Sequence, residues 1–137
     1  MTRIKYDSEL MKLMTFFESA TGAKVKDCIT QDKLIFVVEE NQMGKAIGKN
    51  GMNIKRLENK LKKKIKLVEF SNDILQFIRN FIYPIEPLNL KNEEGVVTIL
   101  GKDTNSRAML IGREHQNLLN LTDIVKRYFD VKEIKVN

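Results

Sequence analysis

The chain has 137 residues, of which 42% are hydrophobic and 31% charged, and its formal net charge is +6. This length fits one ordinary domain or two very small ones, and the apolar content suffices for a folded core. No apolar run approaches the roughly 18 residues of a membrane span, and the N-terminus lacks the apolar stretch of a secretory signal. We therefore expect a soluble, cytoplasmic protein without a membrane partner.

Residues suited to metal binding or catalysis are scarce. Cys28 and His115 are the only cysteine and the only histidine, which excludes an internal disulfide and a Cys/His zinc site with the usual ligand spacing. No nucleophile stands in a recognisable arrangement with His115, and a lone cysteine is by default a small buried hydrophobe. We therefore expect no enzymatic activity, no metal, no cofactor and no small-molecule substrate.

The positive charge is confined to one half of the chain. Residues 1–71 hold 15 Lys+Arg and 9 Asp+Glu, a net charge of +6, whereas residues 72–137 hold nine of each. The excess is concentrated between Lys45 and Lys66. A uniform solubilising surface would not be distributed in this way, so the pattern favours a localised anion-binding face.

In chain order, the first half predicts a helix, two strands, two helices and a strand. An apolar stripe at helical spacing opens it, formed by Leu10, Leu13, Met14 and Phe17. Asp7 or Ser8 is the expected N-cap of this helix, and Gly22 its stop. Strands are expected at 24–30 and 34–38, a short helix at 42–47, a longer helix carrying Ile54, Leu57 and Leu61, and a closing strand at 65–70.

The second half repeats the first with an offset of 64 residues. The apolar stripe returns as Ile74, Phe77, Ile78 and Phe81, and Ile47-Gly48 and Asn53-Ile54 return as Ile111-Gly112 and Asn117-Leu118. Ser71 or Asn72 is the expected cap of the opening helix, and Pro84 and Pro87 its stop. The remaining elements are expected at 88–91, 96–100, 103–111, a helix around Leu118, Leu121 and Val125, and 131–136. We infer two copies of one α-β-β-α-α-β unit, residues 1–70 and 71–137.

A glycine-rich turn carries the most specific chemistry of the sequence. Gly48 and Gly51 bracket Lys49 and Asn50 between two predicted helices. Glycine lets a ligand approach the backbone closely, and the following helix N-terminus favours an anion. The neighbouring cations are Lys45, Lys55 and Arg56. These features suit a phosphodiester backbone. A nucleoside-triphosphate loop is excluded, because only three residues separate Gly44 from the Gly-Lys pair and Asn50 stands where Ser or Thr is needed.

A GXXG turn between two helices of an α-β-β-α-α-β unit resembles the type II KH domain, in which helices cover a three-stranded mixed sheet. The loop of this family clamps about four single-stranded nucleotides. The tandem of two such units resembles the archaeal NusA-like transcription termination/antitermination proteins. The resemblance implies an α+β fold and RNA binding through Gly48, Lys49, Asn50 and Gly51. It also implies an apolar groove floor that includes Ile47 and Ile54.

The second copy departs from this pattern at its loop. The equivalent positions are Gly112, Arg113, Glu114 and His115, followed by Gln116. Arg113, His115 and Gln116 remain candidates for RNA contact beside Gly112. A side chain at His115 is expected to crowd the phosphate path and Glu114 to repel it, so we expect a weaker, auxiliary site.

The sequence leaves several alternatives open. The run of lysines from Lys60 to Lys66 is either a solvated face or an RNA contact. Five methionines are expected to fill the core or the groove, namely Met11, Met14, Met43, Met52 and Met109. Single-stranded nascent RNA is the expected ligand, with RNA polymerase or other transcription factors as further partners. A ribosomal-RNA-binding or ribosome-assembly protein and a tandem used mainly for protein docking are the competing hypotheses.

Overall fold

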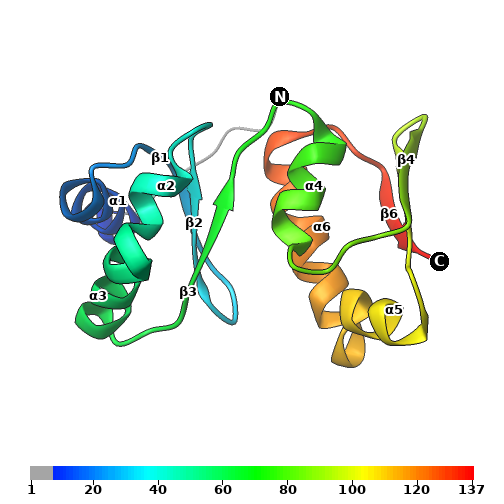
Figure 1. Cartoon of the computed structure of the whole chain (residues 1–137). Helices are drawn as coiled ribbons and strands as arrows, with labels where there is room; N and C mark the ends of the chain where they lie inside the picture. Colours follow the sequence, from blue (N-terminus) through cyan, green and yellow to red (C-terminus); the bar gives the residue numbers. More distant parts are fainter. Residues whose placement is uncertain (1–7) are drawn as a thin grey trace. The chain divides into compact units, whose positions relative to one another are not determined.

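The computed structural model of the chain describes residues 8–137. It separates into two compact units between Ser71 and Asn72, and each unit contains one three-stranded sheet with helices on one of its faces (Figure 1). The expected helical cap Asp7 lies outside the described residues. Among the described residues, no helix is both long and apolar enough to cross a membrane.

The elements of the first unit follow the expected order. They are α1 (Ser8–Thr21), β1 (Val25–Thr30), β2 (Leu34–Val38), α2 (Met43–Ile47), a 3-10 turn η1 (Lys49–Gly51), α3 (Met52–Leu61) and β3 (Ile65–Glu69). The opening helix ends directly before Gly22, whose φ of +77° continues no right-handed helix. The predicted stop is therefore confirmed.

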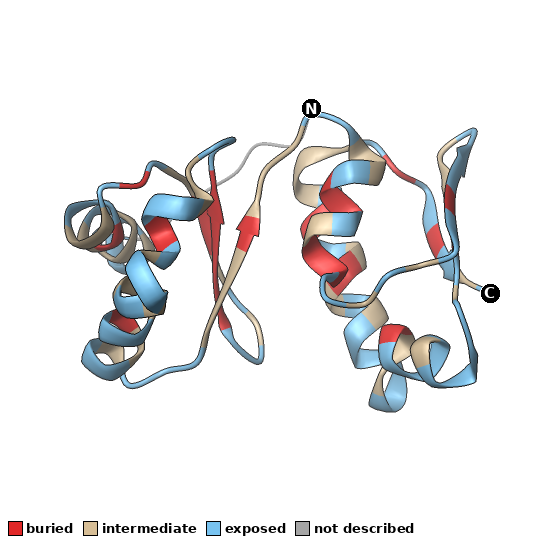
Figure 2. Ribbon diagram, viewed as in Figure 1, coloured by how far each residue is buried: buried red, intermediate tan, exposed pale blue. Residues whose placement is uncertain are grey.

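The sheet of the first unit is mixed and has the order β1-β2-β3. The β1 and β2 strands are antiparallel, whereas β2 and β3 are parallel, with Phe36 opposite Cys28 and Leu67. Every residue of β2 is buried (Figure 2), which its unbroken apolar sequence favours. On the helical side, Phe36 stacks on Phe17 of α1 with ring centroids 4.3 Å apart, and Leu57 of α3 completes this core. The core thus fixes α1 and α3 against the central strand.

The second unit repeats this architecture. Its elements are α4 (Ile74–Ile82), β4 (Asn89–Glu93), β5 (Val96–Leu100), α5 (Thr104–Ile111), a 3-10 turn η2 (Arg113–His115), α6 (Gln116–Tyr128) and β6 (Glu133–Val136). Its sheet has the order β4-β5-β6, again with one antiparallel and one parallel pair. Phe77 of α4 is fully buried and contacts Tyr128 edge-on at 5.5 Å between ring centroids. Burial along β5 alternates, as expected of a strand that buries one face.

Three local predictions are wrong. The N-cap of α4 is Asp73, whose Oδ1 accepts a hydrogen bond from the Leu75 N–H at 3.2 Å, and not Ser71 or Asn72. All three side chains can cap a helix, and the apolar stripe begins only at Ile74. The predicted turn at 92–95 is shorter, because β4 continues to Glu93. The last strand begins at Glu133 and not at 131.

The expectation for the methionines also fails in part. The side chains of three of them, Met11, Met52 and Met109, are at least half exposed. Met11 lies on the outer side of its helix, and the other two lie beside the turns that follow α2 and α5. These three do not fill the core, whereas Met14 and Met43 pack against the core of the first unit. Met52 instead lines a hollow on the outer side of α3.

Cys28 is a buried, free thiol, as the sequence predicts. Burial raises the pKa of this thiol to about 12, with a further contribution from the Asp27 carboxylate beside it. The thiolate is the reactive form of cysteine. The structure thus holds Cys28 in its unreactive form.

We expect Cys28 to resist alkylation while the protein is folded. With a pKa of about 12 in place of 9.0, its thiolate fraction near neutral pH is about a thousand times smaller than in the unfolded chain. Iodoacetamide modification followed by mass spectrometry, with and without urea, measures the difference. Equal rates in both states would contradict the assigned burial.

Candidate functional site

The turn between α2 and α3 has a backbone that only glycine adopts readily at its first position. Gly48 ends α2 with φ 76° and ψ 172°, a combination found almost only for glycine. Asn50 and Gly51 follow in the left-handed region, with φ of 55° and 72°. Asparagine tolerates this region better than most residues. The chain thereby reverses direction within three residues and enters α3.

One side chain holds this turn against the preceding helix. Nδ2 of Asn53, in the first turn of α3, donates a hydrogen bond of 2.8 Å to the carbonyl oxygen of Lys45 in α2. The Asn53 side chain fills the space above Gly48, so that a Cβ at Gly48 would lie 2.7 Å from Asn53 Cγ. At Gly51 the nearest atom to such a Cβ would be 3.8 Å away. Gly48 is therefore required sterically, whereas Gly51 is favoured only by its backbone conformation.

The turn presents polar hydrogen atoms to solvent at the start of a helix. The Gly51 N–H donates to the Gly48 carbonyl oxygen at 3.1 Å, but the N–H groups of Lys49 and Asn50 open the 3-10 turn and have no partner within it. Both residues are exposed. The helix α3 follows directly, and its dipole favours negative charge here. An anion is the ligand that this backbone fits best.

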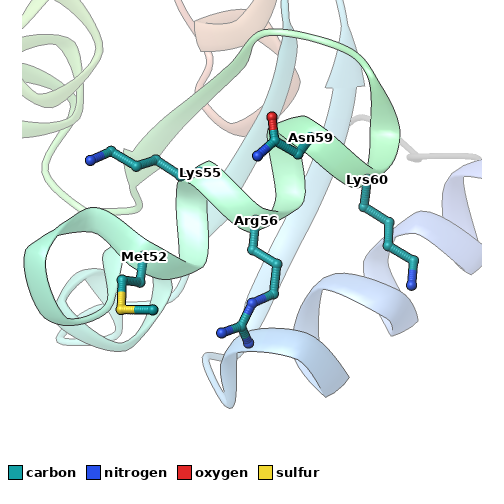
Figure 3. Close-up of a pocket in the computed structure, with 5 residues that line it drawn as sticks. All are labelled: Met52, Lys55, Arg56, Asn59 and Lys60. Atoms are coloured by element: carbon teal, nitrogen blue, oxygen red, sulfur yellow. The ribbon is translucent and has the colours of Figure 1, made fainter.

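The predicted cations surround the turn. Lys45, Lys49, Lys55 and Arg56 are all exposed, and within residues 8–137 none of them forms an ion pair. Figure 3 shows Arg56 and Lys55 extending to different sides of α3. A shallow hollow of about 560 Å³ lies along the outer side of this helix, lined by Met52, Lys55, Arg56, Asn59 and Lys60. Unpaired cations on a hollowed surface attract an extended polyanion.

Apolar side chains lie beside the same turn. Ile47 is 39% exposed and Met52 54% exposed, whereas Ile54 is half-buried. Exposed apolar groups beside a charged surface offer contacts to the faces of bases. Of the two predicted floor residues, Ile47 is the more accessible.

The second turn has the same backbone as the first, although it lacks the second glycine. Gly112 has φ 76° and ψ 173°, and Glu114 and His115 have φ of 55° and 63°. Asn117 Nδ2 donates to the Met109 carbonyl oxygen at 2.8 Å, as Asn53 does to Lys45. A Cβ at Gly112 would lie 2.5 Å from Asn117 Cγ. The first glycine and the asparagine are thus kept, and they suffice to keep the turn.

The side chains of the second turn differ from those of the first. Arg113, Glu114 and His115 are exposed. Gln116 is exposed too, but its Nε2 donates to Asn120 Oδ1 at 2.9 Å along α6. Glu114 lies between Arg113 and His115 in the chain and adds a carboxylate to this turn. The backbone of the second site is therefore equivalent, but its charge is not.

Asn53 and Asn117 hold the two turns in place, and the glycine motif alone does not reveal them. The sequence contained the signal, because the 64-residue offset carries one asparagine onto the other. Their role depends on a side-chain hydrogen bond across eight residues, which no spacing rule predicts. Within residues 8–137, no group of three or more His, Cys, Asp or Glu side chains can hold a metal ion.

His115 occupies a left-handed backbone conformation that costs a non-glycine residue about 1 kcal/mol. We expect His115→Gly to raise the free energy of unfolding of the second unit by about that amount. His115→Ala is the matched control, because it removes the imidazole and keeps the conformational cost. Urea denaturation followed by circular dichroism measures both variants. An equal gain for His115→Ala would mean that the imidazole, and not the backbone, is the source.

Comparisons with known proteins agree with this geometry. The model of the KH domain family matches residues 12–94, which is more than half of the chain and includes the whole of the first turn. A relative from Methanococcus vannielii, described as "Probable transcription termination protein NusA", is 39% identical in an alignment of 138 positions that covers 98% of this chain and 80% of the relative. A relative of the same description from Thermoplasma acidophilum is 32% identical and covers 99% of this chain and 97% of the relative.

A solved structure has the same fold. The crystal structure of APE1850 superposes with a TM-score of 0.76 at 27% sequence identity, covering 96% of this chain and 100% of that one. Fold, turn geometry and sequence relatives point to the same group of proteins. The chain belongs to the KH domain family and, within it, to the archaeal NusA-like proteins.

Proposed function

We propose that the two units are tandem type II KH domains, residues 1–70 and 71–137, and that the first binds single-stranded RNA. Two features support the assignment of the units. Each has the order α-β-β-α-α-β with a mixed sheet. The turn lies between the second and third helices of each unit, α2 and α3 in the first and α5 and α6 in the second. The matched family residues end at position 94, inside the second unit, so the assignment of that unit depends mainly on the internal repeat.

The observation that carries RNA binding is the turn from Gly48 to Gly51. Its backbone leaves two N–H groups open to a phosphate, and Lys49 supplies a mobile charge beside them. The cations that continue the surface are Lys45, Lys55 and Arg56, and the apolar contacts for bases are Ile47 and Ile54. A phosphodiester strand with unstacked bases uses all of these groups together.

The transcriptional role is proposed from the relatives. Proteins described as probable transcription termination protein NusA cover nearly the whole chain. We propose that this protein acts in the cytoplasm, without enzymatic activity, on nascent RNA as a termination or antitermination factor. RNA polymerase or other transcription factors would then be its protein partners. Crosslinking followed by sequencing of the bound RNA tests this role, because ribosomal RNA in place of nascent transcripts would contradict it.

Charge reversal within the first turn should strongly weaken RNA binding without unfolding the protein. In Lys49→Asp/Asn50→Asp both glycines are kept, and both changed side chains are exposed. Repulsion of the phosphate should weaken the affinity for a short single-stranded RNA at least about tenfold, or 1.4 kcal/mol. Fluorescence anisotropy measures the affinity. Asp at Gly48 is avoided, because any Cβ there meets Asn53.

Lys132→Asp/Asn137→Asp is the matched control for this variant. It makes the same change of net charge on two exposed residues of the second unit. We expect the control to bind RNA nearly as well as the natural protein. Equal losses in both variants would show that overall charge, and not the turn, governs binding.

The second turn should contribute as an auxiliary site. Arg113 can grip a phosphate with two parallel hydrogen bonds, but Glu114 beside it opposes an anion. Arg113→Ala should therefore weaken binding to a long RNA and barely affect an oligonucleotide of about four nucleotides, which one turn accommodates. Lys49→Ala should weaken both. If Arg113→Ala affects the short oligonucleotide more than Lys49→Ala does, the primary site is in the second unit.

A further inference from the structure

Exposed lysines gather at the end of α3 that is remote from the turn. The distal lysine patch consists of Lys33, Lys60, Lys62, Lys63 and Lys64, all exposed. The β1–β2 connection and the α3–β3 connection meet there, because the Leu34 N–H donates to the Lys64 carbonyl oxygen at 3.0 Å (Figure 1). Folding thus adds Lys33 to a run that is already basic in sequence.

The patch is only weakly neutralised by the protein itself. Within residues 8–137, none of its five ammonium groups forms an ion pair. Glu58, the acidic residue of α3, accepts a hydrogen bond from the Ile65 N–H at 3.0 Å. The pKa of Lys66 is lowered, first by burial and then by the charge of Lys33, while Asp32 opposes the shift. The local field is therefore positive and available to an external anion.

The backbone at the centre of the patch violates a local preference. Lys62 directly follows the last helical residue of α3 and lies in the left-handed region, with φ 55° and ψ 41°, where glycine is the usual residue. In the second unit the equivalent Lys126 lies inside α6, and the helix continues to Tyr128. A solvated surface does not require a strained lysine at this point.

The outer side of α3 connects the patch with the turn. Its exposed residues Lys55, Arg56 and Lys60 line the shallow hollow of Figure 3, with Met52 and Asn59. No exposed carboxylate of α3 interrupts them. Lys62 lies eleven positions after Gly51 in the chain, which corresponds to about 16 Å along a helix. The basic surface therefore extends about 16 Å beyond the turn along α3.

We propose that the distal lysine patch is a second RNA-backbone contact of the first unit, which holds the strand after it leaves the turn along α3. This inference rests on the proposed RNA binding and extends it to a surface outside the loop. An RNA strand is favoured over an acidic peptide because the cations form one track that begins at the phosphate-binding turn. The contact is electrostatic and independent of base sequence.

The triple variant Lys62→Gln/Lys63→Gln/Lys64→Gln tests the patch. Binding to an oligonucleotide of about four nucleotides should not change, whereas binding to one about three times as long should weaken at least about tenfold at low salt. The slope of log K against log[salt] for the longer RNA should become less negative by about 2, since three phosphate contacts are lost. The control Lys102→Gln/Lys132→Gln/Lys135→Gln removes the same charge from exposed positions of the second unit.

Lys62→Gly separates binding from stability. Glycine relieves the left-handed strain, so the thermal midpoint should rise by a few degrees, roughly 2–4 °C. The affinity for the longer RNA should nevertheless fall about twofold or more, because one phosphate contact is lost. A purely structural role of Lys62 would move only the midpoint.

The outcomes distinguish the patch from the turn. The Lys49→Asp/Asn50→Asp variant can lose RNA affinity while the triple lysine variant binds the longer RNA like its control. In that case the proposed function stands, and the proposed RNA contact of the patch is wrong. If neither variant loses RNA, the proposed function itself fails. Poly-glutamate serves as a probe for an acidic peptide. Loss of poly-glutamate binding in the triple variant, with RNA affinity unchanged, would assign the patch to a protein partner and overturn the proposal.

Discussion

The hydrogen bond from Asn53 Nδ2 to the Lys45 carbonyl oxygen, 2.8 Å long, sets the geometry on which the site depends. It ties the first turn of α3 to α2 and places the asparagine side chain directly over Gly48. A Cβ at this glycine would lie 2.7 Å from Asn53 Cγ. A residue larger than glycine at position 48 is therefore incompatible with the asparagine position that makes the hydrogen bond. Because this bond fixes how α2 meets α3, it also fixes where the open N–H groups and the cations of α3 lie. The geometry of the candidate site therefore depends on packing and not on charge alone.

The two glycines of the motif satisfy different physical requirements. The first has a backbone conformation found almost only for glycine, and it also lies under the asparagine. The second has only a left-handed conformation, which other residues adopt at a cost of about 1 kcal/mol. The second unit shows the consequence: His115 replaces the second glycine, and the backbone angles change by about ten degrees or less. The differences between the two sites must therefore come from their side chains.

The repeated pattern of apolar residues predicted the order of elements and most of their bounds, because helix and strand periodicity is local. Predictions failed where several residues could do the same task. Ser71, Asn72 and Asp73 can all cap a helix, and only the packing of α4 selects Asp73. The exposure of Met52 and Met109 depends on which side of a short helix faces the sheet. The shape of the second turn was also not predictable from its residues, since histidine disfavours the conformation that the asparagine contact imposes.

The equivalent ends of α3 and α6 show how one scaffold acquires two surface chemistries. With the 64-residue offset, Lys64 corresponds to Tyr128, whose ring contacts Phe77 of the second core at 5.5 Å. The helix α6 can therefore continue to that residue, and its basic side chains Lys126 and Arg127 remain within the last turn, where the helix dipole favours them. In the first unit the helix ends at Leu61, and the lysines that follow belong to an exposed connection. With a lysine in place of this aromatic core contact, the helix of the first unit ends earlier, and Lys62, Lys63 and Lys64 lie in an exposed connection directly beyond its C-terminus. The excess charge of the chain is thus concentrated in the unit that keeps both glycines.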